Sequence, residues 1–240
     1  MPWKRKFKQS GGITKKAKAT PLTQTQVKAL VRKGAISVAE TKHCFRVDLN
    51  KQLYHNAGAS GFQIYTGILY NLNGTADEDA PSANRYDSRI GDEIYLQDLE
   101  LRFWLSNKAD RPNVMYRIVV FKYYDTVNAP TAISAVLTPT GNCILDYCEE
   151  SKITVLRDVR VNPGGTDFSL EASSTQREKS TFRRMLIPFN NVKIKYRETG
   201  AQPKDWDIGV AVVAYDAFGS VTLDNIASFS WNYRLRFKDP

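Results

Sequence analysis

Two histidines and three cysteines are the side chains with which this chain could perform nucleophilic, redox or metal chemistry. His43 falls in the first predicted strand, and His55 in a loop rich in Gly, Ala and Ser. No G-x-S-x-G sequence or other nucleophile context accompanies them, so packing or surface roles are favoured over a catalytic triad. Cys143 and Cys148 lack the C-x-x-C spacing of zinc and redox sites. Cys44 makes the number of cysteines odd, which favours a reducing compartment over a disulfide scaffold.

The other motifs with chemical potential are short. Residues 77–79, Asp-Glu-Asp, could hold a hard cation such as calcium at a subunit contact, although a solvated loop explains them more simply. Residues 73–75 match a glycosylation sequence, but residues 1–25 lack the apolar core of a signal peptide, so we expect neither secretion nor modification. No glycine-rich phosphate loop and no long apolar run occur. We expect no enzyme activity, no cofactor and no membrane span. We also expect no metal site; a composite site of the cysteines and histidines is the disfavoured alternative.

The strongest functional signal is an asymmetry of charge. The chain has 34 Lys and Arg against 25 Asp and Glu, a formal net charge of +9. Residues 1–39 hold ten of the basic residues and no acidic one, which leaves 24 basic and 25 acidic residues in 40–240. A basic arm on a neutral body predicts binding of a polyanion through the arm. The ten basic residues are Lys4, Arg5, Lys6, Lys8, Lys15, Lys16, Lys18, Lys28, Arg32 and Lys33.

Residues 1–20 contain too little apolar surface to offset the entropy of ordering them, so we expect this segment to be disordered until it meets its ligand. Its two clusters, 4–8 and 15–18, suit neutralisation of phosphates, with Trp3 and Phe7 able to stack on unpaired bases. The same exposed Lys and Arg residues in 4–8 and 15–18 suit a nuclear import signal. The two interpretations are compatible, and a merely solubilising tail is the plain alternative.

Residues 20–34 predict a short basic helix. Thr23 can cap its N-terminus, and Gln26 three residues later completes a capping box. Gly34 can end the helix with a left-handed residue. The apolar residues form a narrow stripe that needs a partner, either the body or another copy of the chain. This stripe consists of Val27, Leu30 and Val31.

The body has the pattern of strands. Apolar residues alternate with polar ones, β-branched and aromatic types dominate, and no alternation of strands with helices occurs. Phe45, Val47 and Leu49 share one face of the first strand, and 118–121 and 210–214 are apolar enough for central strands. We expect one short helix among the strands of the body, near 132–137. The predicted strands are 38–49, 62–66, 68–70, 93–105, 114–124, 153–161, 182–188, 192–196, 208–215 and 227–237. An all-β antiparallel sandwich or barrel is therefore predicted.

The order of these features resembles the jelly-roll capsid proteins of small circular, Rep-encoding, single-stranded DNA viruses. It is more distantly similar to the coat proteins of satellite plant RNA viruses. The resemblance covers nearly the whole chain, and its more specific parts are the Arg-x-Gly-Asp segment at 89–92 and the last strand. The matching segments are the basic arm, the helix at 22–33, the strand opening at 40–43, 89–94 with the strand through 105, 115–121, 153–158 and 233–239.

This resemblance implies a single eight-stranded antiparallel jelly roll at 37–240, preceded by a basic arm at 1–20 and a short helix and linker at 21–36. It also implies a homo-oligomer, namely an icosahedral shell of about sixty copies that packages a single-stranded DNA genome. The expected location is the virion and the host nucleus, which the free subunit would enter by binding an import receptor. Charge alone does not exclude RNA, because both nucleic acids carry phosphates.

Sixty arms would carry about 600 positive charges, whereas three nucleotides for each of 240 residues give 720 phosphates. The arms alone therefore cannot neutralise a complete genome, and counterions or basic residues of the body must supply the rest. Two alternatives remain at this point. One is a non-viral nuclear nucleic-acid-binding β-barrel protein. The other is a lectin-like or cupin-type jelly roll, of which the cupin needs a cluster of histidines that two isolated ones do not provide.

Overall fold

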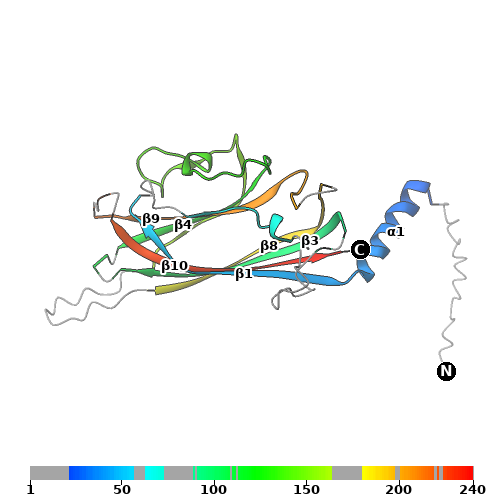
Figure 1. Cartoon of the computed structure of the whole chain (residues 1–240), viewed down its shortest axis with the longest axis horizontal. Coiled ribbons are helices and arrows are strands. Elements are labelled where there is room, and N and C mark those ends of the chain that lie inside the picture. The colour runs from blue at the N-terminus through cyan, green and yellow to red at the C-terminus, as the bar shows by residue number, and fades with distance from the viewer. Residues whose placement is uncertain are drawn as a thin grey trace, which may run out of the picture.

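Alternating apolar and polar residues form strands from residue 41 onward, and one helix precedes them (Figure 1). The computed structural model describes residues 22–56, 63–72, 89, 91–108, 110–111, 113–163, 180–197, 201–218, 221 and 224–239. The helix is α1 (Gln24–Val38). The strands are β1 (Thr41–Tyr54), β2 (Gln63–Tyr65), β3 (Glu93–Asn107), β4 (Val114–Tyr123), β5 (Leu137–Thr138), β6 (Tyr147–Cys148), β7 (Ile153–Val161), β8 (Ser180–Lys195), β9 (Asp207–Asp216) and β10 (Asn225–Lys238).

Eight of these strands form two four-stranded antiparallel sheets that pack face to face. The first sheet has the order β1-β10-β3-β8 and the second the order β2-β9-β4-β7. Apart from β4 and β7, which pair within the second sheet, consecutive strands of this pair of sheets lie in opposite sheets. The first and last described strands, β1 and β10, lie side by side. This double-sheet arrangement of eight strands is the jelly roll. The predicted all-β jelly roll with a short N-terminal helix is thereby confirmed.

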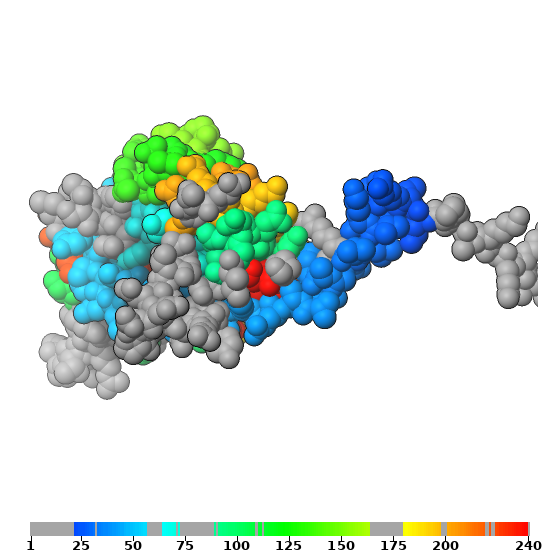
Figure 2. Space-filling view, turned by 45° about the vertical axis from the view of Figure 1, so that its right-hand side comes forward, coloured from blue at the N-terminus to red at the C-terminus, as the bar shows by residue number. Residues whose placement is uncertain are grey.

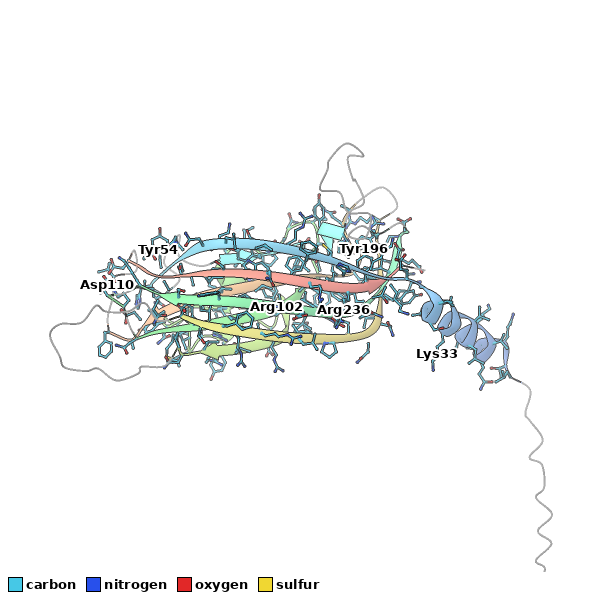
Figure 3. The ribbon with its side chains drawn as sticks, turned by 90° about the horizontal axis from the view of Figure 1, so that it is seen from below. Lys33, Tyr54, Arg102, Asp110, Tyr196 and Arg236 are labelled. Carbon is cyan, nitrogen blue, oxygen red and sulfur yellow. The ribbon has the colours of Figure 1, made fainter. Side chains whose placement is uncertain are left out.

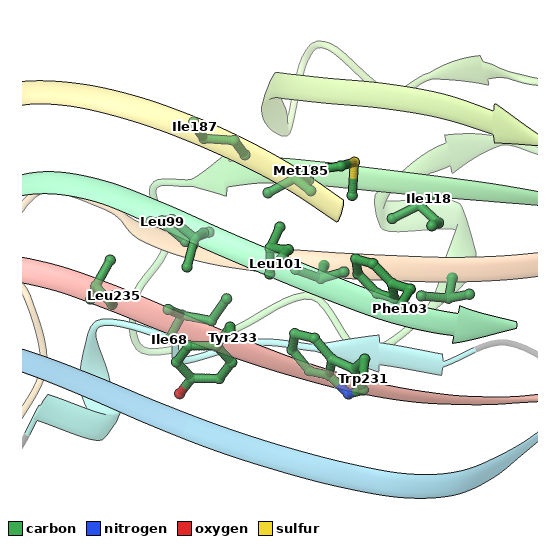
Figure 4. Close-up of a cluster of buried hydrophobic side chains, with 14 of the residues drawn as sticks. Ile68, Leu99, Leu101, Phe103, Ile118, Met185, Ile187, Trp231, Tyr233 and Leu235 are labelled. Atoms are coloured by element: carbon green, nitrogen blue, oxygen red, sulfur yellow. The ribbon is translucent and has the colours of Figure 1, made fainter. Parts of the chain in front are cut away.

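The main core lies between the two sheets. Alternate residues of each strand point into it, because successive side chains of a strand project to opposite sides. Figure 4 shows part of this layer, where Phe103 of β3 stacks on Trp231 of β10 at a centroid distance of 5.8 Å. Strands β4 and β9 lie in the middle of the second sheet, as their apolar sequences predict, and nearly all of their residues are buried.

A second, smaller core covers the outer side of the second sheet. The connection between β4 and β7, with a 3₁₀ helix (Ile133–Ala135) and the β5–β6 hairpin, folds back over that sheet (Figure 1). Buried Arg117 of β4 ties the connection down by donating to the carbonyl oxygens of Cys143 and Asp146 and to the Asp158 carboxylate. Consequently only the first sheet has an outer side that the described chain leaves bare.

Three local predictions were wrong. The predicted strand at 68–70 is a turn that leads into a 3₁₀ helix (Tyr70–Leu72), because the buried carboxylate of Asp207 accepts the backbone N–H groups of Leu69 and Tyr70 and so replaces strand pairing. The strands predicted at 182–188 and 192–196 form one strand, β8, which bends at Asn190 and Asn191 with φ of 53° and 60°. Asparagine tolerates this left-handed conformation better than most residues.

The helix is the third case, because α1 passes through Gly34 and ends at Val38, where the first strand was predicted to begin. That strand was predicted at 38–49 and is observed as β1 at Thr41–Tyr54. Lys238 of β10 donates from its ammonium group to the carbonyl oxygens of Ile36 and Ser37 at 2.7 and 3.3 Å. A cation at the C-terminal end satisfies carbonyl groups that have no partner within the helix. The last strand therefore stabilises an extra turn that a glycine stop would have removed.

Candidate nucleic-acid interface

Helix α1 begins with the capping box that the sequence predicts. The Thr23 hydroxyl accepts from the Gln26 backbone N–H at 3.3 Å, and the Gln26 side chain accepts from the Thr23 N–H at 2.9 Å. Lys28 and Lys33 are exposed on the helix, and Figure 3 shows Lys33 projecting from the side of α1 beyond the end of the sandwich. Arg32 lies in the same helix. The helix therefore presents basic side chains to solvent.

The apolar stripe of α1 does not pack on the body. Val27, Leu30 and Val31 are between 45% and 66% exposed. Figures 1 and 2 show why, because the helix extends beyond one end of the sandwich. The expected partner of this stripe is therefore not the described body of the same chain.

The other predicted nucleic-acid-binding residues lie outside the described residues. They are Lys4, Arg5, Lys6, Lys8, Lys15, Lys16 and Lys18, together with Trp3 and Phe7 for base stacking. The acidic run at 77–79 and the sequon at 73–75 also lie outside them.

The histidines and cysteines are not arranged as a reactive site. His43 is exposed on β1, whereas His55 is buried, accepts the Asp216 backbone N–H at its Nδ1 atom, and has its pKa lowered by burial. Burial raises the pKa of the Cys143 thiol to about 12 and also raises that of Cys148. No group of three or more His, Cys, Asp or Glu side chains in the described part of the chain is placed to hold a metal ion. The helix in the described ranges is too short and too polar to cross a membrane.

The bare outer side of the first sheet, called here the outer face, carries a regular array of side chains. Residues directly opposite one another on neighbouring strands form four rows across it. In the fourth row β1 has no directly paired residue, and the backbone N–H of Asn50 donates to the Ser230 hydroxyl instead. The rows, from β1 to β8, are His43-Arg236-Asp98-Pro188, Phe45-Arg234-Glu100-Leu186, Val47-Asn232-Arg102-Arg184, and Ser230-Trp104-Phe182 on the last three strands. Four arginines against two carboxylates give this array a net charge of +2.

Glu100 lies at the centre of the array and binds three arginines. Its Oε1 atom accepts from Nε of Arg102 at 2.9 Å and from Nε of Arg184 at 2.7 Å, and its Oε2 atom accepts from Arg234 at 2.6 Å. The hydrogen bond from Arg102 and those from the other two arginines outweigh the cost of burial and lower the pKa of Glu100 to about 2. Glu100 is therefore ionised at every ordinary pH, with 2% of its side chain exposed.

The three arginines are only partly occupied by Glu100. Their side chains are between 44% and 59% exposed. A guanidinium has five N–H donors, and within the described residues the contacts with Glu100 use two donors of Arg102 and one each of Arg184 and Arg234. Each of the three side chains therefore keeps N–H donors that do not contact Glu100 and is partly open to solvent. Figure 3, which views this sheet from below, shows Arg102 and Arg236 along the strands of the outer face.

Large apolar side chains border the arginines. Trp104 and Phe182 lie directly opposite each other on β3 and β8 and are 60% and 61% exposed. Phe45 and Val47 of β1 are also exposed, and they line a depression of about 170 Å³ together with Glu100, Arg102, Asn232, Tyr233 and Arg234. The shared face of Phe45, Val47 and Leu49 is thus the exposed one, and it is Cys44 and Leu53 that enter the core from β1.

Sequence reasoning did not select the outer face as a site. The signal was present, since Glu100, Arg102 and Trp104 alternate with the apolar residues of β3, and Arg234 and Arg236 do so in β10. The sequence does not show that β10 lies between β1 and β3, which is what brings these side chains together.

Comparisons with known proteins give a limited result. No protein-family model and no curated protein matches the chain. Among solved structures, it is similar to a chain of sacbrood virus of honeybee in expansion state II, with 12% identity over 84% of this chain and 93% of that chain and a TM-score of 0.31. It is also similar to a chain of the full particle of Israeli acute paralysis virus heated to 63 degrees (11% identity, 98% and 83% covered, TM-score 0.28). A chain of the Israel acute paralysis virus pentamer gives 10% identity, 87% and 99% covered, and a TM-score of 0.29. These scores are too low to carry the assignment of the fold, which rests on the strand order.

Proposed function

We propose that this chain is a viral capsid subunit that assembles into a closed icosahedral shell and packages single-stranded DNA through its basic N-terminal arm. The protein acts by binding and assembly and catalyses no reaction. Residues 4–8 and 15–18 serve both in packaging and in import of the free subunit into the host nucleus.

The observation that carries the proposal is the placement of α1. The jelly roll closes its main core with its own strands, yet α1 lies beyond the sandwich with its apolar stripe exposed. A second copy of the chain would remove that stripe from water, as neighbouring subunits do in a shell. The ten basic residues of 1–39 precede or lie in this helix, so every subunit would present them from the same end of its body.

The similarity of the order of sequence elements to that of capsid proteins of single-stranded DNA viruses indicates which partner the chain binds. It supports a shell of about sixty subunits and a DNA genome, and nuclear import suits the basic clusters. The competing function is a non-viral nuclear nucleic-acid-binding protein, which has the same arm and needs no assembly. The size of the purified protein separates the two.

Assembly is tested on the purified full-length chain by sedimentation velocity and electron microscopy. We expect closed spherical particles, and we expect the Leu30→Ser, Val31→Ser double variant to remain small. Both residues are exposed in the single chain, so their replacement leaves the body folded. Ala29→Ser, on the opposite side of the helix, is the matched control and should assemble normally. A monomer at high concentration with nucleic acid present would refute the capsid function.

Packaging and import have separate readouts. Deletion of residues 1–20 removes seven basic residues. In a plot of the logarithm of affinity for single strands against the logarithm of salt concentration, these residues should contribute a slope of about −5, so the deletion variant should give a line that is less steep by about that amount. Digestion of packaged nucleic acid with DNase and RNase identifies the genome type. Residues 1–20 fused to a reporter too large to diffuse through the nuclear pore should carry it into the nucleus, and replacing the basic residues with Ala should prevent this.

A further inference from the structure

We propose that the outer face of the β1–β10–β3–β8 sheet is a second binding site for single-stranded nucleic acid, with arginines on the phosphates and aromatic side chains on the bases. The proposal rests on the proposed function in one respect, since packaging supplies the ligand. It assigns a role to residues of the body, whereas the arm precedes the body in the chain.

The first reason is that this side of the sandwich is uncovered while the opposite side is covered. The β4–β7 connection buries the outer side of the second sheet under a core of its own. The outer face has no such cover within the described chain and leaves Trp104, Phe182 and Phe45 more than half exposed. Large apolar side chains gathered on one bare face indicate a binding surface.

The second reason is the arrangement of charge. Arg102 and Arg184 lie directly opposite each other on β3 and β8, a like-charge placement that ordinarily destabilises a sheet. Glu100 compensates by holding both, together with Arg234, through its two oxygens. Three guanidinium groups are thereby fixed around one carboxylate, and their side chains are still between 44% and 59% exposed. Arginine donors in a planar fork match phosphate oxygens.

The third reason is the interleaving of the two kinds of side chain. The row of Arg102 and Arg184 adjoins the row of Trp104 and Phe182, one side-chain repeat further along the same strands. On the other side of Arg102, the depression of about 170 Å³ has Phe45 and Val47 among its lining residues. Binding of single strands without sequence preference combines a positively charged track with aromatic side chains on which bases stack. Charge complementarity, with a net charge of +2 on the array, favours this ligand over a second copy of the same face.

A further reason is that the positive charge of the arms is too small to neutralise the genome. About 600 arm charges fall short of the 720 phosphates that this coding sequence alone requires. A net charge of +2 on each of about sixty outer faces would supply about 120 more, which matches that minimum.

The site is tested by photo-crosslinking of the full-length chain to an oligodeoxythymidine that carries 5-iododeoxyuridine, followed by mass spectrometry. We expect adducts on peptides containing Trp104 or Phe182 in addition to any on the arm. The Arg184→Gln, Trp104→Ala variant should lose about tenfold in affinity, within the range known for loss of one stacked base, and its salt slope should fall by about 0.7. The matched control is Arg157→Gln, Tyr147→Ala, which removes an exposed arginine and an exposed tyrosine elsewhere on the body. It should bind within about twofold of the native chain.

The outcomes separate this site from the proposed function. Adducts confined to residues 1–39, with equal affinities for both double variants, would overturn the outer-face site and leave the capsid function intact. If p-benzoylphenylalanine is introduced at position 182, its photocrosslinking to a second chain in particles free of nucleic acid would overturn the site in favour of a second copy of the chain. Failure of the native chain to form particles, with adducts at Trp104 retained, would overturn the capsid function and support the site. Both double variants should still unfold cooperatively, and the first should unfold at a slightly lower temperature because it loses the hydrogen bond from Arg184 to the buried carboxylate of Glu100.

Discussion

Replacement of Glu100 by Gln should weaken the fold and strengthen the binding of nucleic acid at the same time. The carboxylate accepts hydrogen bonds from three arginines and is almost completely buried. Its loss removes charge-assisted hydrogen bonds, but the arginines are half exposed and regain water. We therefore expect the free energy of unfolding to fall by about 1–2 kcal/mol, measured by urea denaturation.

The pH dependence of this difference has a definite sign. The pKa of Glu100 lies at about 2, below its usual value of 4.5, so its contribution to stability is fully present above pH 4.5 and is lost as the pH falls towards 2. The stability difference between the native chain and Glu100→Gln should therefore shrink over that interval and be constant from pH 5 to pH 8.

Binding should change in the opposite direction. Without the carboxylate the net charge of the outer face rises from +2 to +3, and the guanidinium groups lose their internal competitor for phosphate. The salt slope for oligodeoxythymidine should become steeper by about 0.7, as measured by filter binding across a salt series. Glu150→Gln, which makes the same charge change at an exposed position of the β4–β7 connection, is the control. Weaker binding, or a slope equal to that of the control, would refute the assignment of these arginines to phosphate.

Three further predictions concern the body. Replacing Arg117 by Met leaves two carbonyl oxygens without their side-chain donor and leaves Asp158 paired with Arg160 at 3.6 Å. Urea denaturation should therefore show a loss of about 2–5 kcal/mol, and a loss under about 1 kcal/mol would contradict the role of Arg117 in fixing the β4–β7 connection. Gly209→Ala would place a methyl group 2.4 Å from the ring of Phe121, so thermal unfolding should report a loss of about 1–3 kcal/mol, whereas Gly34→Ala, with open space around it, should be neutral or stabilising. Because burial raises the pKa of the Cys143 thiol to about 12, a thiol reagent at mildly alkaline pH should modify it far more slowly in the native than in the denatured chain, and equal rates would show that the second core opens freely.

The fold was predictable because its signals are local and repeated. Strand β7 was predicted at its observed bounds, and the bounds of β3, β4 and β9 differ from prediction by at most two residues, since each is a long run of β-branched and aromatic residues. The capping box of Thr23 and Gln26 involves residues three apart, and it formed as expected. The strand pattern predicted an antiparallel sandwich or barrel, and loops of unequal length favoured a jelly roll over an up-and-down barrel. The eight-stranded jelly roll itself was what the resemblance in the order of sequence elements implied.

The parts that were missed depend on residues far apart in the chain. The extra turn of α1 needs Lys238, about 200 positions away, and the turn at residue 68 needs Asp207. The sequence predicted that Phe45, Val47 and Leu49 share one face of the first strand but not whether that face is buried, because this depends on the neighbouring sheet. The arginine cluster required the pairing of β3 with both β8 and β10, so its three arginines could be read in the sequence only as separate residues of three amphipathic strands.

The position of β10 has a consequence for how the protein is made. This strand is the last of the described strands to leave the ribosome, yet it lies between β1 and β3, and it also carries Lys238, which bonds to α1. Until β10 is in place, β1 has no neighbour in its sheet, Arg234 is missing from the cluster around Glu100, and the end of α1 is unsupported. Pairing across so long a sequence separation is slow. An incompletely synthesised chain would thus lack both the supported last turn of α1 and the completed arginine cluster, so that the final strand must be synthesised before the chain can engage its ligand at the outer face.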